Sequence, residues 1–117
     1  MEKLEFEFGA GQSAPGRTVS GVVSSGDLEV LLEPAAAGRT TVAVQTSVDG
    51  YGATWTALLE RVFGTGLLPA ARIEINDNGA TPGVVRMRIE QAYEQVNAQA
   101  NTHVNTQANH QAKGGQP

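Results

Sequence analysis

The chain has 117 residues, the length of one domain, and a net charge of -4 at pH 7. With 12 acidic against 8 basic residues, the chain lacks the excess of positive charge that binds the phosphates of nucleic acids, so no nucleic acid partner is expected. The chain has no cysteine, which excludes disulfides, thiolate metal sites and cysteine nucleophiles. It also lacks a signal-peptide core and any apolar run of the roughly 18 residues that span a membrane, so we expect a cytoplasmic protein without a membrane partner.

The first half of the chain predicts four strands. Residues 3–8 alternate polar with apolar side chains, as in a strand with one buried face. Residues 17–23 predict β-structure after a turn rich in Gly, Ser and Pro, and residues 28–33 and 40–48 predict two further strands. Turn-forming residues occupy positions 24–27, so Ser24 and Ser25 are expected in a hairpin bend.

The second half predicts two helices around one strand. Between Thr54 and Phe63 apolar residues recur at helical spacing, and glycines follow. Residues 71–76 predict a strand, and the Asp-Asn-Gly sequence at 77–79 predicts a turn. Thr81 is a natural N-cap before a second helix, whose apolar stripe runs to Val96.

The predicted order of elements, β-β-β-β-α-β-α, is typical of the α+β class. We expect a small single domain at residues 1–97, with a mixed or antiparallel sheet of about five strands and both helices on one face. Residues 98–117, rich in Asn, Gln and Ala, have no hydrophobic periodicity and are predicted to form a disordered tail.

Few side chains of the predicted domain could support catalysis. Both histidines, His103 and His110, are in the tail, and the lysines are Lys3 and Lys113. A serine nucleophile would therefore lack its usual base, and the carboxylates would lack His or Cys to complete a metal site. We expect no catalytic residue and no metal ligand.

Ser25 is the candidate attachment point for a covalent group. Gly26 gives the backbone room, Asp27 brings a carboxylate close by, and the flanking strands hold the bend in the open, where a serine can be esterified. Taken alone, these residues are also explained by an ordinary hairpin turn.

Three segments resemble a known family of carriers. Residues 25–34 (SGDLEVLLEP) are similar to the prosthetic-group site of the malonate decarboxylase acyl carrier, or delta, subunits. Residues 76–86 (NDNGATPGVVR) resemble the segment before that family's last helix, and residues 44–48 resemble its middle strand. The resemblance covers residues 1 to about 96. Ser24 stands where the family usually has glycine, so it competes with Ser25, but the position relative to Gly26 and Asp27 favours Ser25.

The resemblance implies a non-catalytic carrier subunit of a multi-subunit decarboxylase. It implies that Ser25 is linked to 2'-(5''-phosphoribosyl)-3'-dephospho-CoA, whose thiol holds acetyl or malonyl as a thioester while malonate is converted to acetate and CO2. Gly26, Asp27 and Glu29 would then help the modifying or partner enzymes to recognise the bend.

The resemblance also implies partners. These are the alpha subunit, which is the acyl carrier transferase, the beta and gamma decarboxylase subunits, a phosphoribosyl-dephospho-CoA transferase and a malonyl transferase. The related carrier of citrate lyase, its gamma chain, shares the Ser-Gly-Asp element but lacks the Thr-Pro-Gly-Val-Val run found at residues 81–85, and it is the nearest alternative.

Two further alternatives come from other classes of protein. A non-catalytic adaptor without a covalent group would leave Ser25 unmodified. An enzyme would need a carboxylate-only site, for which Asp77 is the residue to test. Asp77 and Asn78 could also contact a hard cation, although turn formation explains them more simply.

Overall fold

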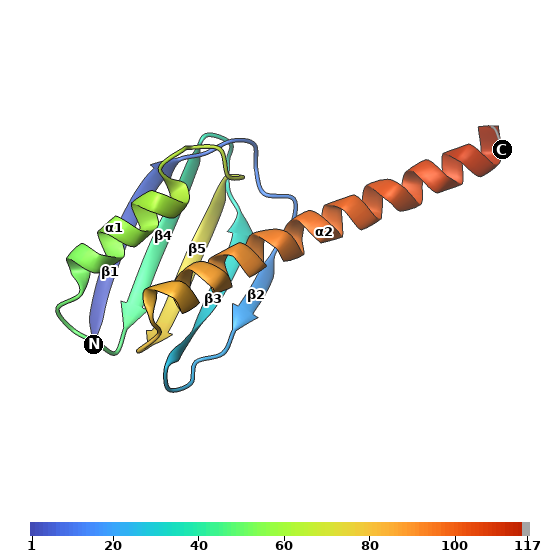
Figure 1. Ribbon diagram of the computed structural model, residues 1–117. Coiled ribbons are helices and arrows are strands. Elements are labelled where there is room, and N and C mark those ends of the chain that lie inside the picture. The colour runs from blue at the N-terminus through green and yellow to red at the C-terminus, as the bar shows by residue number, and fades with distance from the viewer. Residues whose placement is uncertain (116–117) are drawn as a thin grey trace.

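The computed structural model describes the backbone of residues 1–115 and the side chains of residues 1–100 (Figure 1). Its elements follow the predicted order. The strands are β1 (Glu2–Gly9), β2 (Thr18–Gly21), β3 (Asp27–Pro34), β4 (Arg39–Thr46) and β5 (Ala71–Asn78), and the helices are α1 (Gly52–Phe63) and α2 (Pro82–Gly115).

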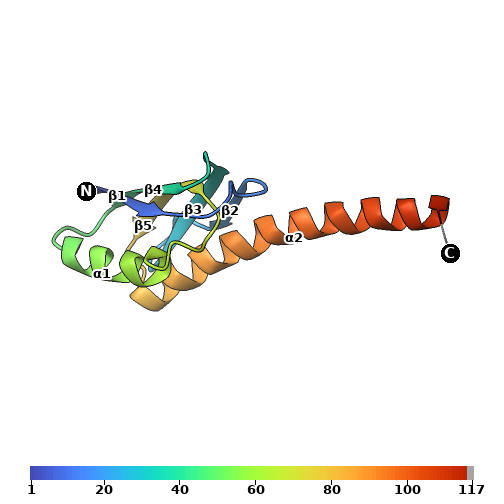
Figure 2. The ribbon, with the colours of Figure 1, turned by 90° about the horizontal axis from the view of Figure 1, so that it is seen from above.

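The five strands form one mixed sheet in the order β1-β4-β5-β3-β2. The β4–β5 pair is parallel, and the other three pairs are antiparallel. Because parallel neighbours need a crossover connection, α1 lies between β4 and β5 in the chain. Both helices cover the same face of the sheet (Figure 2). The predicted α+β fold with both helices on one face is confirmed, and of the two predicted kinds of sheet, mixed or antiparallel, the structure has the mixed one.

The core lies between the sheet and the two helices. Alternate residues of each strand point toward the helices, as the period of two requires. The helices contribute the residues of their apolar stripes. The fully buried side chains include Leu28, Val30 and Leu32 of β3, Ile73 and Ile75 of β5, Leu59 and Phe63 of α1, and Ile89 and Val96 of α2. Among residues 1–115, no helix covers the opposite face of the sheet (Figure 2).

Several predicted boundaries differ from the structure; the strand predicted at residues 40–48, for example, ends at Thr46. Asp77 and Asn78 were predicted in a turn, but they belong to β5 because they pair with Leu28 and Asp27 of β3. The turn begins at Gly79, whose φ is +85°. The predicted strand at 17–23 is shortened to Thr18–Gly21, because the backbone leaves the strand at Gly21.

Helix α2 begins as predicted and extends further than its apolar stripe. The Thr81 hydroxyl accepts a hydrogen bond from the Val84 amide (3.4 Å), which is an N-cap. The helical backbone continues to Gly115, through a sequence rich in Asn, Ala and Gln that forms no apolar face. Residues 116–117, and the side chains from residue 101 onward, lie outside the described residues, so the predicted domain limit at residue 97 and the disordered tail at 98–117 stay predictions.

Within the described part of the chain, no helix has both the length and the apolar character needed to cross a membrane.

The central position of β5 can be tested by truncating one buried side chain. Ile75→Ala should lower the free energy of unfolding by about 2–5 kcal/mol, because it removes buried methyl groups and leaves a cavity. Leu67→Ala is the control, since Leu67 is 81% exposed and its truncation should change stability by less than about 0.5 kcal/mol. Urea unfolding followed by circular dichroism measures both, and equal losses would contradict the buried position of Ile75.

Candidate functional site: the Ser25 bend

Ser25 lies exposed in the turn between β2 and β3. This turn is at the end of the sheet where β4 and β5 also end (Figure 1). Two hydrogen bonds fix the backbone around it: the Gly26 amide donates to the Asn78 carbonyl (2.8 Å), and the Asp27 amide donates to the Ser24 carbonyl (2.9 Å). Ser25 is therefore held on a defined bend and is open to solvent.

Gly26 is required at its position for a conformational reason. Its φ is +75°, in the left-handed region that side chains with a Cβ rarely adopt. A Cβ built at Gly26 would meet no atom within 4 Å apart from its chain neighbours, so the space at Gly26 is open. Gly26 thus provides the turn that the sequence predicted.

Asp27 is held by an ion pair with Arg88 of α2. The guanidinium donates twice, from Nη2 to Oδ2 (2.7 Å) and from Nε to Oδ1 (3.1 Å), and the Leu28 amide also donates to Oδ1 (2.7 Å). The hydrogen bond from Arg88 and that from Leu28 lower the pKa of Asp27, against the opposing effect of burial. The same bond raises the pKa of Arg88. A two-point Arg–carboxylate pair of this kind fixes orientation as well as charge, so it fastens the bend to α2.

A row of polar side chains on α2 extends this attachment along β2. Arg88, Gln91 and Gln95 follow helical spacing and lie beside the apolar stripe. The Ser20 hydroxyl and Arg88 Nη1 both donate to Gln91 Oε1 (3.1 Å each), and the Thr18 hydroxyl donates to Gln95. Sequence analysis missed this row, although three polar residues at helical spacing next to a buried stripe were a usable signal.

Gly21 allows the close approach of the helix to the hairpin. A Cβ at Gly21 would lie 2.1 Å from the Leu28 carbonyl oxygen and 3.0 Å from the Arg88 side chain. Any other residue would therefore displace the neighbouring strand or the ion pair.

Glu29 does not join the other predicted recognition residues on the helix side. Its neighbours Leu28 and Val30 are buried toward the helices, so Glu29 lies on the uncovered face of the sheet. There it accepts a hydrogen bond from Asn76 Nδ2 (3.1 Å). The structure thus brings Gly26 and Asp27 together beside Ser25 and separates Glu29 from the Asp27–Arg88 pair.

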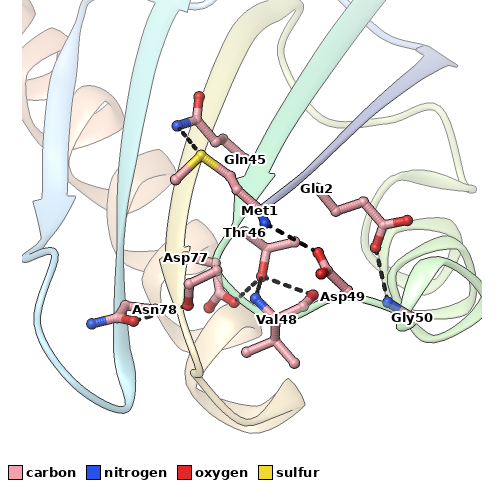
Figure 3. Close-up of polar contacts among 10 residues, drawn as sticks. Met1, Glu2, Gln45, Thr46, Val48, Asp49, Gly50, Asp77 and Asn78 are labelled. Atoms are coloured by element: carbon pink, nitrogen blue, oxygen red, sulfur yellow. Dashed lines mark hydrogen bonds and ion pairs between the residues drawn. The ribbon is translucent and has the colours of Figure 1, made fainter.

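Asp77 organises the loops next to the bend. Its carboxylate accepts hydrogen bonds from the Thr46 hydroxyl (2.8 Å) and from the amides of Gly79 (3.2 Å) and Ala80 (3.0 Å). Figure 3 shows the side chains of Thr46 and Asp77 directed toward one another. Among the residues described, no group of three or more His, Cys, Asp or Glu side chains could hold a metal ion. The contacts of Asp77 are those of a residue that shapes its turn.

Comparisons with known proteins agree on one family. The family described as the malonate decarboxylase delta subunit matches residues 16–96. The chain is 60% identical over 94 residues to a malonate decarboxylase acyl carrier protein of Pseudomonas paraeruginosa, covering 80% of this chain and 95% of that protein. The corresponding protein of Stutzerimonas stutzeri is 56% identical over the same shares.

A solved structure is also similar. It is a chain of a Pseudomonas malonate decarboxylase hetero-tetramer crystallised in complex with malonate, with a TM-score of 0.79 and 54% sequence identity. The similarity covers 82% of this chain and 99% of that chain. The fold and the sequence therefore point to the same group of proteins.

The Asp27–Arg88 pair can be tested through its pH dependence. Because the pKa of Asp27 in the folded chain lies below its ordinary 3.8, the pair stabilises the fold above that pH, and its contribution is lost as the pH falls through the lower folded pKa. Asp27→Asn should therefore lower the urea midpoint at pH 7, and the difference from wild type should shrink below pH 3.8.

Glu90→Gln is the matched control for this experiment. Glu90 also pairs with an arginine, Arg86 (3.4 Å), but both side chains are exposed, so its effect should be small at every pH. A difference between Asp27→Asn and wild type that does not vary with pH would contradict the charge-based account.

Proposed function

Because the chain belongs to the malonate decarboxylase delta-subunit family, we propose that it serves as the acyl carrier of a malonate decarboxylase complex. The observation that carries the proposal is an exposed serine, Ser25, on a bend that β5 holds through a backbone hydrogen bond and α2 holds through the Asp27–Arg88 ion pair. On this proposal the chain catalyses nothing itself and presents an acyl group to other subunits that convert malonate to acetate and CO2.

We propose Ser25 Oγ as the attachment point of 2'-(5''-phosphoribosyl)-3'-dephospho-CoA, through a phosphodiester. The bend fits such a group, since Ser24, Ser25 and Gly26 are all exposed and the space beside Gly26 is empty. The group, when bound, supplies the thiol that this cysteine-free chain lacks, and with it a thioester. The chain's own contribution is to hold the attachment oxygen in the open, at a defined place on a rigid domain.

Both serines are exposed, and Ser25 is preferred over Ser24 for its position directly before Gly26 and Asp27. The Ser24 amide donates to the Val22 carbonyl (3.1 Å), and the Ser24 carbonyl accepts from Asp27, so both polar groups of its backbone are held inside the turn. Ser25 precedes the left-handed Gly26, where the chain reverses direction. Membership of the malonate decarboxylase family sets the citrate lyase-like carrier aside, and the adaptor without a covalent group remains the alternative.

The proposed partners act on or beside this bend. They are the alpha subunit as acyl carrier transferase, the beta and gamma decarboxylase subunits, the phosphoribosyl-dephospho-CoA transferase and the malonyl transferase. The similar chain of known structure belongs to a hetero-tetramer, which supports assembly with other subunits. Gly26, Asp27 and Glu29 would contribute to recognition, Asp27 by keeping the shape of the bend through Arg88 and Glu29 by presenting a carboxylate on the uncovered face. Tethering the acyl group raises its effective concentration at each successive site.

Intact mass with peptide mapping tests the attachment. Coexpression with the phosphoribosyl-dephospho-CoA transferase of the same source should add the mass of the group to wild type and to Ser24→Ala, and none to Ser25→Ala. Both variants change an exposed turn residue, so circular dichroism should show that both remain folded.

Two results would change the proposal. Modification that persists in Ser25→Ala but not in Ser24→Ala would move the attachment to Ser24. An unchanged wild-type mass, with a transferase shown to be active on another carrier, would overturn the carrier function in favour of the adaptor.

A further inference from the structure

A pocket of about 260 Å³ lies between α1 and the beginning of α2. Its walls are largely apolar and include Trp55, Leu58 and Val85, and Tyr51 lies at its edge with 54% of its surface exposed. Thr46 and Asp77, whose side chains meet in Figure 3, line it from the sheet. The pocket is thus an apolar space with an aromatic ring at its edge, and its one charged lining group already has its hydrogen bonds.

The pocket adjoins the Ser25 bend through a single loop. Gly79 and Ala80, which line the pocket, follow directly after Asn78, whose carbonyl accepts the hydrogen bond of the Gly26 amide. A Cβ at Gly79 would lie 4.0 Å from the Gly26 nitrogen. A group attached at Ser25 therefore leaves the chain one loop away from the pocket.

We propose that this pocket binds the adenine base of the prosthetic arm. The inference rests on the proposed function, because it requires an arm on Ser25. The chemical connectivity of the arm selects the base: the phosphoribosyl unit joins Ser25 to the 2' oxygen of the adenosine, so the adenosine is the nearest large group to the bend, and the pantetheine end is further away.

The lining of the pocket suits a flat heteroaromatic ring. Tyr51 offers an exposed ring for stacking, and aromatic stacking tolerates any base because every base has a π-face. Thr54 and Thr81 also line the pocket, and a threonine hydroxyl can donate to a ring nitrogen. Because the base is tethered, even a weak site is occupied. Binding of the base would fix the part of the arm nearest to Ser25, while the thiol end stays free to reach other subunits.

Trp55 reports on the pocket directly, since it lines the pocket and is the only tryptophan in the chain. The full-length chain is modified with the transferase, the mass increase is verified, and Trp55 emission is compared with that of the unmodified chain. Modification should change the emission of wild type and of Tyr51→Phe, which keeps the ring. Tyr51→Ala should lose most of this change at an equal mass increase, and the control Leu67→Ala should keep it.

Free fragments of the arm identify the part that binds. Added to the unmodified chain, AMP should change Trp55 emission in the same direction as modification, and pantetheine should not. A response to pantetheine alone would overturn the assignment of the base. A fully modified wild type with unchanged Trp55 emission, or an equal response in Tyr51→Ala, would overturn the pocket and leave the carrier function standing. A chain that gains no mass would overturn the proposed function, and this inference with it.

Discussion

The fold depends on β5 as the central strand of the sheet. It pairs in parallel with β4 and antiparallel with β3, and its inward residues Ile73 and Ile75 are buried under the helices. Its last two residues then serve the site: Asp77 holds the loops after β4 and β5, and the Asn78 carbonyl holds the Ser25 bend. One strand therefore supplies the centre of the core and the backbone anchors of the functional end.

Periodicity in the sequence was sufficient to predict the elements but not their order in the sheet. The alternation in residues 28–33 and the helical spacing in residues 54–63 show which side chains of each segment are buried. This pattern can be seen within one segment alone. Strand order depends on contacts between distant segments, so the mixed sheet was predicted only as one of two options. The turn predicted at 77–79 failed for the same reason: Asp77 and Asn78 favour turns locally, but pairing with β3 extends the strand through them.

The candidate site likewise has a part that the sequence predicted and a part that only the structure shows. Turn chemistry at residues 24–27 placed the serines in a bend, and the family resemblance selected Ser25. The partner of Asp27 could not be found from spacing, because Arg88 lies 61 residues further along the chain. The pocket could not be predicted from the sequence either, because its lining residues come from separate segments, among them the end of β4, α1 and the start of α2. The local sequence therefore predicts the bend, but only the folded structure shows which residues hold it in place.

The Asp27–Arg88 contact also has a consequence for biosynthesis. The chain is made from its N-terminus, so Ser25 leaves the ribosome well before β5 and the first turns of α2 exist. Until those residues emerge, the bend has only the hydrogen bonds within its own turn, because the Asn78 carbonyl and the Arg88 guanidinium are both absent. An enzyme that recognises the shape of this bend would therefore act only on a finished domain, and a truncated or unfolded chain would escape loading. If Ser25 carries the proposed arm, the 61 residues that separate Asp27 from Arg88 thus make folding a prerequisite for its attachment.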